Sequence, residues 1–238
     1  MFVPLHDSTP LKVIRFQAVT IIVIALNVVM YLTTGAFHSE AVLDQIASGY
    51  GVVPAELTHS AAPVLAYNPI AEPLTLVTYM FLHAGWWHLI SNMLFLWVFA
   101  DNVEDAYGHA AFASLYLMSG VVAALLYVML GPSSRLPLIG ASGAVSGILG
   151  AYVVLFPRAR VWILLFLRIP LRIGALWVLG GWFLLQIFSW WLYRADPEAG
   201  IAWAAHIGGF MAGAGLTWAL RRRLWLRLEP ESGYLPKS

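Results

Sequence analysis

Six long apolar stretches divide this chain, and they constrain its fold more than any other feature. A helix that crosses a membrane needs about 20 mostly apolar residues. Hydrophobic residues make up 61% of the chain and charged residues only 11%, a balance that a soluble domain does not have. We therefore predict an all-α membrane protein, a bundle of six transmembrane helices, over residues 16–33, 86–100, 110–130, 142–156, 173–192 and 201–220.

The basic residues give these helices a direction. Of the 13 lysines and arginines, all but Arg135 and Arg194 fall in the terminal segments or between the fourth and fifth stretches. Loops rich in Lys and Arg stay on the cytoplasmic side of a membrane, so both termini are predicted to be cytoplasmic. The chain then divides into an N-terminal segment (1–15), a six-helix transmembrane domain (16–220) and a C-terminal tail (221–238). The first helix lacks a small-residue cleavage site, and we expect it to be retained.

Two other segments are apolar without being predicted to cross. Residues 161–167 are too few to span a bilayer and are bracketed by arginines, so we expect them at the membrane interface. The connection 35–85 carries no Lys or Arg and several prolines, and we expect it to pack against the outer membrane surface.

Composition also limits the ligands. The net charge of +1 gives no electrostatic reason for nucleic acid as a partner. The absence of cysteine excludes disulfides and thiolate chemistry. We expect no cofactor and no metal, because the histidines lack carboxylate or thiolate companions at ligand spacing. The expected partners are the lipid bilayer and other membrane proteins, and the sequence leaves the oligomeric state open.

Polar residues from three separate helices meet at one membrane depth in this topology. The second, fourth and sixth helices all enter from the outer face, bringing in His83, His88 and Asn92, then Ser142, then His206. Polar residues inside a membrane are costly, so their convergence indicates a functional site. The fourth helix is only about 22 Å long against a bilayer core of roughly 30 Å, which predicts that its outer end lies at the floor of a water-filled cavity.

Glycines predict how Ser142 and His206 meet. Gly143 and Gly147 form one small-residue face on the fourth helix, and Gly209 and Gly213 form another on the sixth. Such faces let helix backbones approach closely. A serine within hydrogen-bond reach of an imidazole is an activated nucleophile, with the histidine as general base.

No carboxylate is placed to complete a triad. The predicted oxyanion donors are His88, Asn92 and the backbone N–H of Ser142, which opens a helix.

These residues also carry a resemblance to the rhomboid family of intramembrane serine proteases. Gly140-Ala141-Ser142-Gly143 is similar to the family's G-x-S-G nucleophile motif, and His206 through Gly213 is similar to its H-x-x-G-x-x-x-G motif. His83, His88 and Asn92 match its H-x-x-x-x-H-x-x-x-N pattern, in which the second histidine and the asparagine line the oxyanion site. The resemblance covers roughly residues 72–220. It implies cleavage of single-span membrane proteins in or near their transmembrane segments, and we expect a multi-pass protein of the bacterial cytoplasmic (inner) membrane.

Two positions depart from the family pattern. Leu74-Thr75 stands where the family often has a Trp-Arg pair, and Ser146 stands where well-known bacterial members carry an aromatic that stacks on the catalytic imidazole. Ser146 is one turn after Ser142, so one hypothesis is that it accepts a hydrogen bond from His206 and fixes its tautomer. The alternative is that Ser146 only keeps this helix face small. Bulky residues in the outer half of the fifth helix, Trp182 and Phe183 among them, are predicted to gate substrate entry.

Two other functions compete with proteolysis. The histidines could line the path of a small transporter, although no inverted repeat or broken helix supports one. A catalytically inactive rhomboid-like chaperone or scaffold is the other alternative, but it would be expected to lack Ser142 or His206, and both are present.

Overall fold

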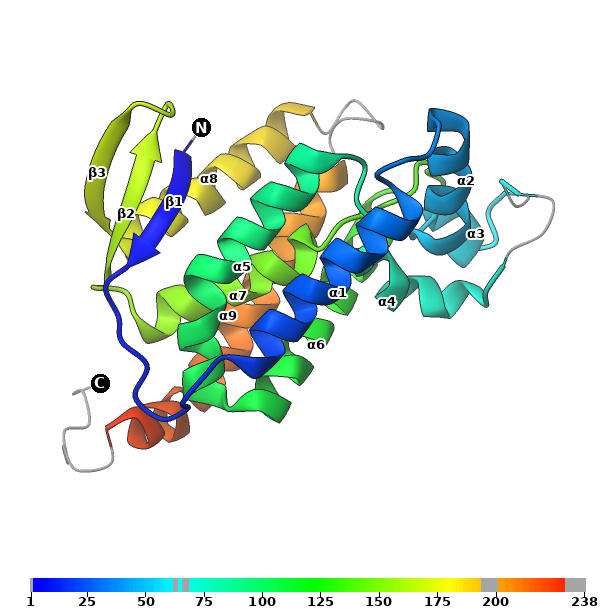
Figure 1. The fold of residues 1–238 in the computed structure, drawn as a ribbon. Helices are drawn as coiled ribbons and strands as arrows, with labels where there is room; N and C mark the ends of the chain where they lie inside the picture. The colour runs from blue at the N-terminus through cyan, green and yellow to red at the C-terminus, as the bar shows by residue number, and fades with distance from the viewer. Residues whose placement is uncertain (1, 62–63, 66–68, 194–200, 230–238) are drawn as a thin grey trace.

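Six long helices form the body of the molecule in the computed structural model, which describes residues 2–61, 64–65, 69–193 and 201–229 (Figure 1). They are α1 (Ala18–Thr34), α5 (Trp86–Tyr107), α6 (His109–Leu130), α7 (Ser142–Leu155), α8 (Ala175–Tyr193) and α9 (Ile201–Leu228). Each corresponds to one predicted stretch, and α5 and α9 continue further than predicted. Arg194 and residues 230–238 of the predicted tail lie outside the described residues.

The hydropathy of these helices varies. In the part of the chain that the structure describes, α6 and α8 are both long and apolar enough to cross a membrane, with mean hydropathies of 2.0 and 1.5. Helices α1 and α7 are apolar but shorter. The structure therefore shows a mostly helical fold, while six membrane crossings and the side on which the termini lie stay predictions.

Helix α7 lies at the centre of the bundle, packed against α5, α6 and α9. Every residue from Gly143 to Tyr152 is buried. Glycines allow α7 and α9 to touch through their backbones: a Cβ atom on Gly209 would lie 2.0 Å from the carbonyl oxygen of Gly143, and one on Gly213 would lie 1.9 Å from that of Gly147. Only glycine fits at such an approach, so this pair of helices is fixed relative to one another.

The structure corrects the all-α prediction, because it contains a three-stranded antiparallel sheet. Its strands are β1 (Phe2–Asp7), β2 (Arg160–Leu165) and β3 (Ile169–Gly174), in the order β1-β2-β3. The run 161–167, expected as an interface segment, supplies most of β2, and Val161 and Ile163 turn inward while Trp162 is exposed. The hairpin turn places Phe166 and Leu167 at positive φ, where Gly or Asn is usual, so the sequence carries no turn signal there.

Two acidic residues at the end of α5 tie down the N-terminal segment. The Asp105 carboxylate accepts the backbone N–H groups of Lys12, Val13 and Ile14 at 2.7 Å each. The Glu104 carboxylate, fully buried, accepts from the Thr20 backbone N–H and hydroxyl in the first turn of α1. A carboxylate at a helix N-terminus satisfies otherwise unpaired donors.

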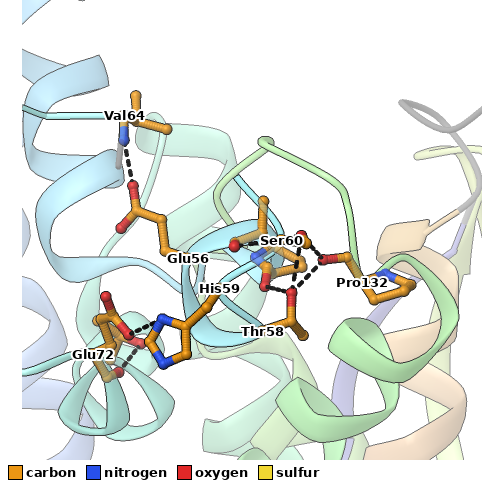
Figure 2. Close-up of polar contacts among 10 residues, drawn as sticks. Glu56, Thr58, His59, Ser60, Val64, Glu72 and Pro132 are labelled. Atoms are coloured by element: carbon orange, nitrogen blue, oxygen red, sulfur yellow. Dashed lines mark hydrogen bonds and ion pairs between the residues drawn. The ribbon is translucent and has the colours of Figure 1, made fainter. Parts of the chain in front are cut away.

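The connection before α5 folds into short helices at the end of the bundle opposite the sheet (Figure 1). They are α2 (Glu40–Tyr50), α3 (Pro54–Leu57), η1 (Glu72–Leu74), α4 (Thr75–Thr78) and η2 (Tyr79–Phe81). The Thr58 and Ser60 hydroxyls donate to the Pro132 carbonyl at 2.7 and 3.0 Å. Figure 2 shows the three residues side by side. These bonds attach the connection to the loop between α6 and α7, which leads into Ser142.

Candidate active site

Ser142 and His206 lie within hydrogen-bond distance of each other. Ser142 is the first residue of α7 and His206 lies in the second turn of α9. The Ser142 Oγ and His206 Nε2 atoms are 2.9 Å apart, and both residues are partly exposed. The close backbone contact between α7 and α9 therefore sets two helix positions 64 residues apart in sequence to face one another.

The loop before Ser142 is held on both sides. Leu138 exchanges two backbone hydrogen bonds with Val52, and the Gly140 N–H donates to the Tyr79 carbonyl at 2.9 Å. Gly140 has a φ of +116°, a backbone conformation that residues with a side chain rarely adopt. A Cβ atom at this position would lie 2.6 Å from the His88 ring. The G-x-S-G pattern thus has a structural reason at its first glycine, which admits the imidazole of His88 beside the nucleophile loop.

His88 and Asn92 lie on one face of α5. The Ala84 N–H points at His88 Nδ1 over a long 3.5 Å contact, which leaves Nε2 as the nitrogen that carries hydrogen toward Gly140. Asn92 is buried, and its side-chain amide donates to the His88 carbonyl at 2.9 Å. His83, also buried, packs edge-on against the His88 ring with centroids 5.0 Å apart. His83 and Asn92 therefore both contact His88, whose ring lies against Gly140.

Ser146 does not form the hydrogen bond to His206 that one hypothesis predicted. Its hydroxyl donates to the Ser142 carbonyl at 2.6 Å, within α7, and the residue is 1% exposed. The partner of the second imidazole nitrogen comes from another helix.

That partner is Gln186 of α8, which sequence reasoning missed. The His206 Nδ1 and Gln186 Oε1 atoms are 2.8 Å apart, and Gln186 is 2% exposed. Trp182 and Trp203 flank the imidazole at centroid distances of 5.9 and 6.1 Å. The available signal was a single amide in the middle of an otherwise apolar helix, since a polar residue at that depth requires a partner.

The site can perform acid–base and nucleophilic chemistry. It holds a hydroxyl bonded to an imidazole, a second imidazole beside the nucleophile loop, and the N-terminus of α7. Within the described residues, no group of three or more His, Asp or Glu side chains is arranged to hold a metal ion. A serine hydroxyl at hydrogen-bond distance from an imidazole has the geometry in which a base can accept the hydroxyl proton.

Comparison with known proteins places this chain in a family. A model of the rhomboid domain matches residues 71–223. Rhomboid protein 1, mitochondrial, of Saccharomyces cerevisiae is 32% identical over 164 residues, 67% of this chain and 45% of the yeast protein. RHOMBOID-like protein 12, mitochondrial, and Rhomboid-like protein 11, chloroplastic, of Arabidopsis thaliana are 27% and 30% identical over 63% and 61% of this chain and 46% and 52% of their own lengths.

These comparisons correct one expectation and establish another. The bacterial cytoplasmic membrane was the wrong location, because the similar proteins are mitochondrial and chloroplastic proteins of eukaryotes. The chain spans about half the length of the curated relatives it matches. The rhomboid match, by contrast, covers more than half of this chain, including every residue of the Ser142–His206 site, and the chain therefore belongs to the rhomboid family.

Proposed function

We propose that this protein is an intramembrane serine endopeptidase, which hydrolyses peptide bonds in or near the transmembrane segments of single-span membrane proteins. The observation that carries the proposal is the 2.9 Å hydrogen bond between Ser142 Oγ and His206 Nε2, in a chain of the rhomboid family. A serine hydroxyl is a weak nucleophile until a base accepts its proton, and this geometry supplies the base.

The first half of the reaction forms an acyl-enzyme. Ser142 Oγ attacks the substrate carbonyl carbon while His206 Nε2 takes the hydroxyl proton. The tetrahedral intermediate then collapses, the peptide C–N bond breaks, and His206 returns the proton to the leaving amine. The fragment with the new N-terminus departs, and the other product remains as an ester on Ser142.

Negative charge develops on the substrate oxygen during this step. The donors proposed to stabilise it are the backbone N–H of Ser142 at the start of α7, the His88 Nε2–H and the Asn92 amide. The position of the His88 ring against Gly140 supports its role. Asn92 donates one N–H to the His88 carbonyl, and this bond holds the amide beside His88. The second N–H of the amide is left available.

Water completes the cycle. A water molecule attacks the ester carbonyl, His206 takes its proton, and Ser142 leaves with that proton. The partial exposure of Ser142 and His206 supports access by water at this end of the bundle. With the six helices placed across a membrane, this end lies opposite the start of α1 and the end of α9. The names of the relatives favour an organellar membrane as the location.

The substrate must lose its own helix before Ser142 can reach a carbonyl. Backbone hydrogen bonds shield each carbonyl of an intact transmembrane helix. We therefore propose substrates with Gly or Pro near the cut and a small residue before it.

The experiment that tests the function is covalent labelling of the purified protein with a fluorophosphonate probe, with the adduct located by mass spectrometry. The expected adduct is on Ser142, and both Ser142→Ala and His206→Ala should abolish labelling and the cleavage of a transmembrane substrate in liposomes. Robust cleavage by purified Ser142→Ala would exclude the mechanism. Absence of labelling and cleavage in the wild type would instead favour an inactive scaffold, and substrate flux without cleavage would favour a transporter.

A further inference from the structure

The imidazole of His206 has a second partner that the reaction above does not use. Its Nδ1 atom lies 2.8 Å from Oε1 of Gln186, which comes from α8 rather than from the α7–α9 pair. Among the described residues, Ser142 and Gln186 are the hydrogen-bond partners of this ring. A histidine that acts as a base needs one nitrogen free of hydrogen and the ring held toward the nucleophile.

The orientation of the Gln186 amide is fixed by its other end. Its Nε2 donates to the backbone carbonyl of Trp182, one turn earlier in α8, at 3.2 Å. A carbonyl oxygen only accepts, so the nitrogen of the amide must face Trp182 and the oxygen must face His206. Rotating the amide by 180° would place two acceptors against each other.

This orientation decides which imidazole nitrogen carries hydrogen. Because Gln186 Oε1 only accepts, His206 Nδ1 must donate to it. The Nε2 atom of the neutral ring is then free of hydrogen, and it is the atom that lies 2.9 Å from Ser142 Oγ. The chain from the Trp182 carbonyl through Gln186 and His206 to Ser142 thus has one consistent direction, in which every donor meets an acceptor.

The Gln186 side chain is buried, so it is not a polar group on the surface of α8. Most residues of α8 are exposed, yet Gln186 is 2% exposed and turned into the bundle. An amide in such surroundings is costly unless it is hydrogen-bonded, and both of its functional groups are bonded here. The two bonds therefore hold the Gln186 side chain, and through it the ring of His206.

We propose that Gln186 is the positioning residue for His206: it holds the imidazole in the tautomer and orientation that let Nε2 act as base toward Ser142. It occupies the place of the carboxylate in a Ser-His-Asp triad but with a neutral acceptor. Because Gln186 belongs to α8, the proposal also makes the base depend on the position of that helix.

The test uses two substitutions of similar length in the full chain in detergent. Gln186→Met removes the acceptor and keeps an unbranched side chain, and Gln186→Glu keeps an acceptor oxygen toward Nδ1. The control is Leu185→Met, on the exposed side of the same helix. We expect Gln186→Met to lower kcat and the rate of fluorophosphonate labelling about 10- to 100-fold, with KM and thermal unfolding close to wild type. Gln186→Glu should keep most of the wild-type rate. Leu185→Met should change neither kcat nor the labelling rate.

The kinetic part rests on the proposed function, so a second readout is independent of it. Nitrogen-15 NMR of histidine-labelled protein reports which ring nitrogen carries hydrogen, and His206→Gln identifies the His206 signals by their loss. The wild type should show hydrogen on Nδ1, and Gln186→Met should lose this single tautomer. If the tautomer changes while the wild type neither reacts with the probe nor cleaves, the positioning role stands and the protease function fails. An unchanged tautomer in Gln186→Met, or rates within twofold of wild type in an active protein, would overturn the proposal.

Discussion

The α7–α9 pair is tightly packed and helix α8 is loosely packed, although both contribute residues to the same site. The α7–α9 pair meets backbone to backbone through Gly143, Gly147, Gly209 and Gly213. Helix α8 buries five of its 19 residues, and a Cβ atom added to its Gly180 or Gly181 would meet no other part of the protein within 4 Å. Ser142 and His206 therefore lie on a rigid pair, whereas the Gln186 amide bonded to His206 lies on a loosely packed helix. A gate on α8, which stays a prediction, would open without displacing Ser142.

The largest effect should come from the same substitution placed in each region. Gly213→Ala puts a methyl group 1.9 Å from the Gly147 carbonyl oxygen, and backbone cannot yield as a side chain does. Overpacking typically costs about 1–3 kcal/mol, so we expect a clear drop in unfolding temperature and loss of Ser142 labelling. Gly181→Ala meets open space and should be neutral or stabilising by up to about 1 kcal/mol. Equal unfolding temperatures for the two variants in detergent would remove the contrast between the regions.

The second effect concerns His88 and Asn92 of α5, the proposed oxyanion donors, which lie beside the rigid pair. His88→Ala removes a ring that packs against Gly140, and we expect kcat to fall about 100-fold with little change in KM. Asn92→Ala should cost less, because one of its N–H groups already serves the His88 carbonyl. Steady-state kinetics on a transmembrane substrate measure both. A change in KM alone would reassign the two residues to substrate binding.

The sequence predicts which residues of α5, α7 and α9 lie together but misses the residue from α8, for a physical reason. Glycine spacing and the polar residues at helix entries are local patterns, and they led to Ser142, His206, His88 and Asn92. Gln186 is one amide in an apolar helix, and its partner lies 20 residues away. Nothing local says which face of α8 turns inward, because that face is so small. The sheet was not predicted for a similar reason, because β1 pairs with β2 across more than 150 residues of sequence.

A substitution on α8 should have a smaller effect than those above and should raise the cleavage rate instead of lowering it. Phe183 stacks on Phe210 of α9 with centroids 4.2 Å apart and is an aromatic contact that holds α8 to the pair. Phe183→Ala should speed cleavage of a transmembrane substrate a fewfold, while the labelling rate with a small fluorophosphonate stays unchanged. Trp182 is a poorer probe of gating, because its ring lies beside His206 and its loss would also disturb the imidazole.

A matched control for Phe183 lies on the same helix. Phe188 is 55% exposed and pairs with Trp191 within α8, so Phe188→Ala removes the same side-chain volume from an outward-facing position. It should leave the cleavage rate near wild type. If both phenylalanine variants behave alike, or if Phe183→Ala is slower, substrate does not enter beside α8.

The smallest effect should come from Ser146→Ala. This variant tests whether His206 is oriented from α7 or, as proposed, from Gln186 of α8. The Ser146 hydroxyl donates to the Ser142 carbonyl one turn earlier, and its Cβ lies 3.4 Å from a Cβ placed on Gly209. Such a bond within a helix contributes little, and alanine keeps the volume small, so stability should fall by less than about 1 kcal/mol. The kcat should stay within about twofold of wild type, whereas Gln186→Met loses at least tenfold. Ser146→Leu should destabilise the protein clearly, because the face toward α9 has no room for it. A tenfold loss of kcat in Ser146→Ala would return the orienting role to α7 and place the whole of the catalytic machinery on the rigid part.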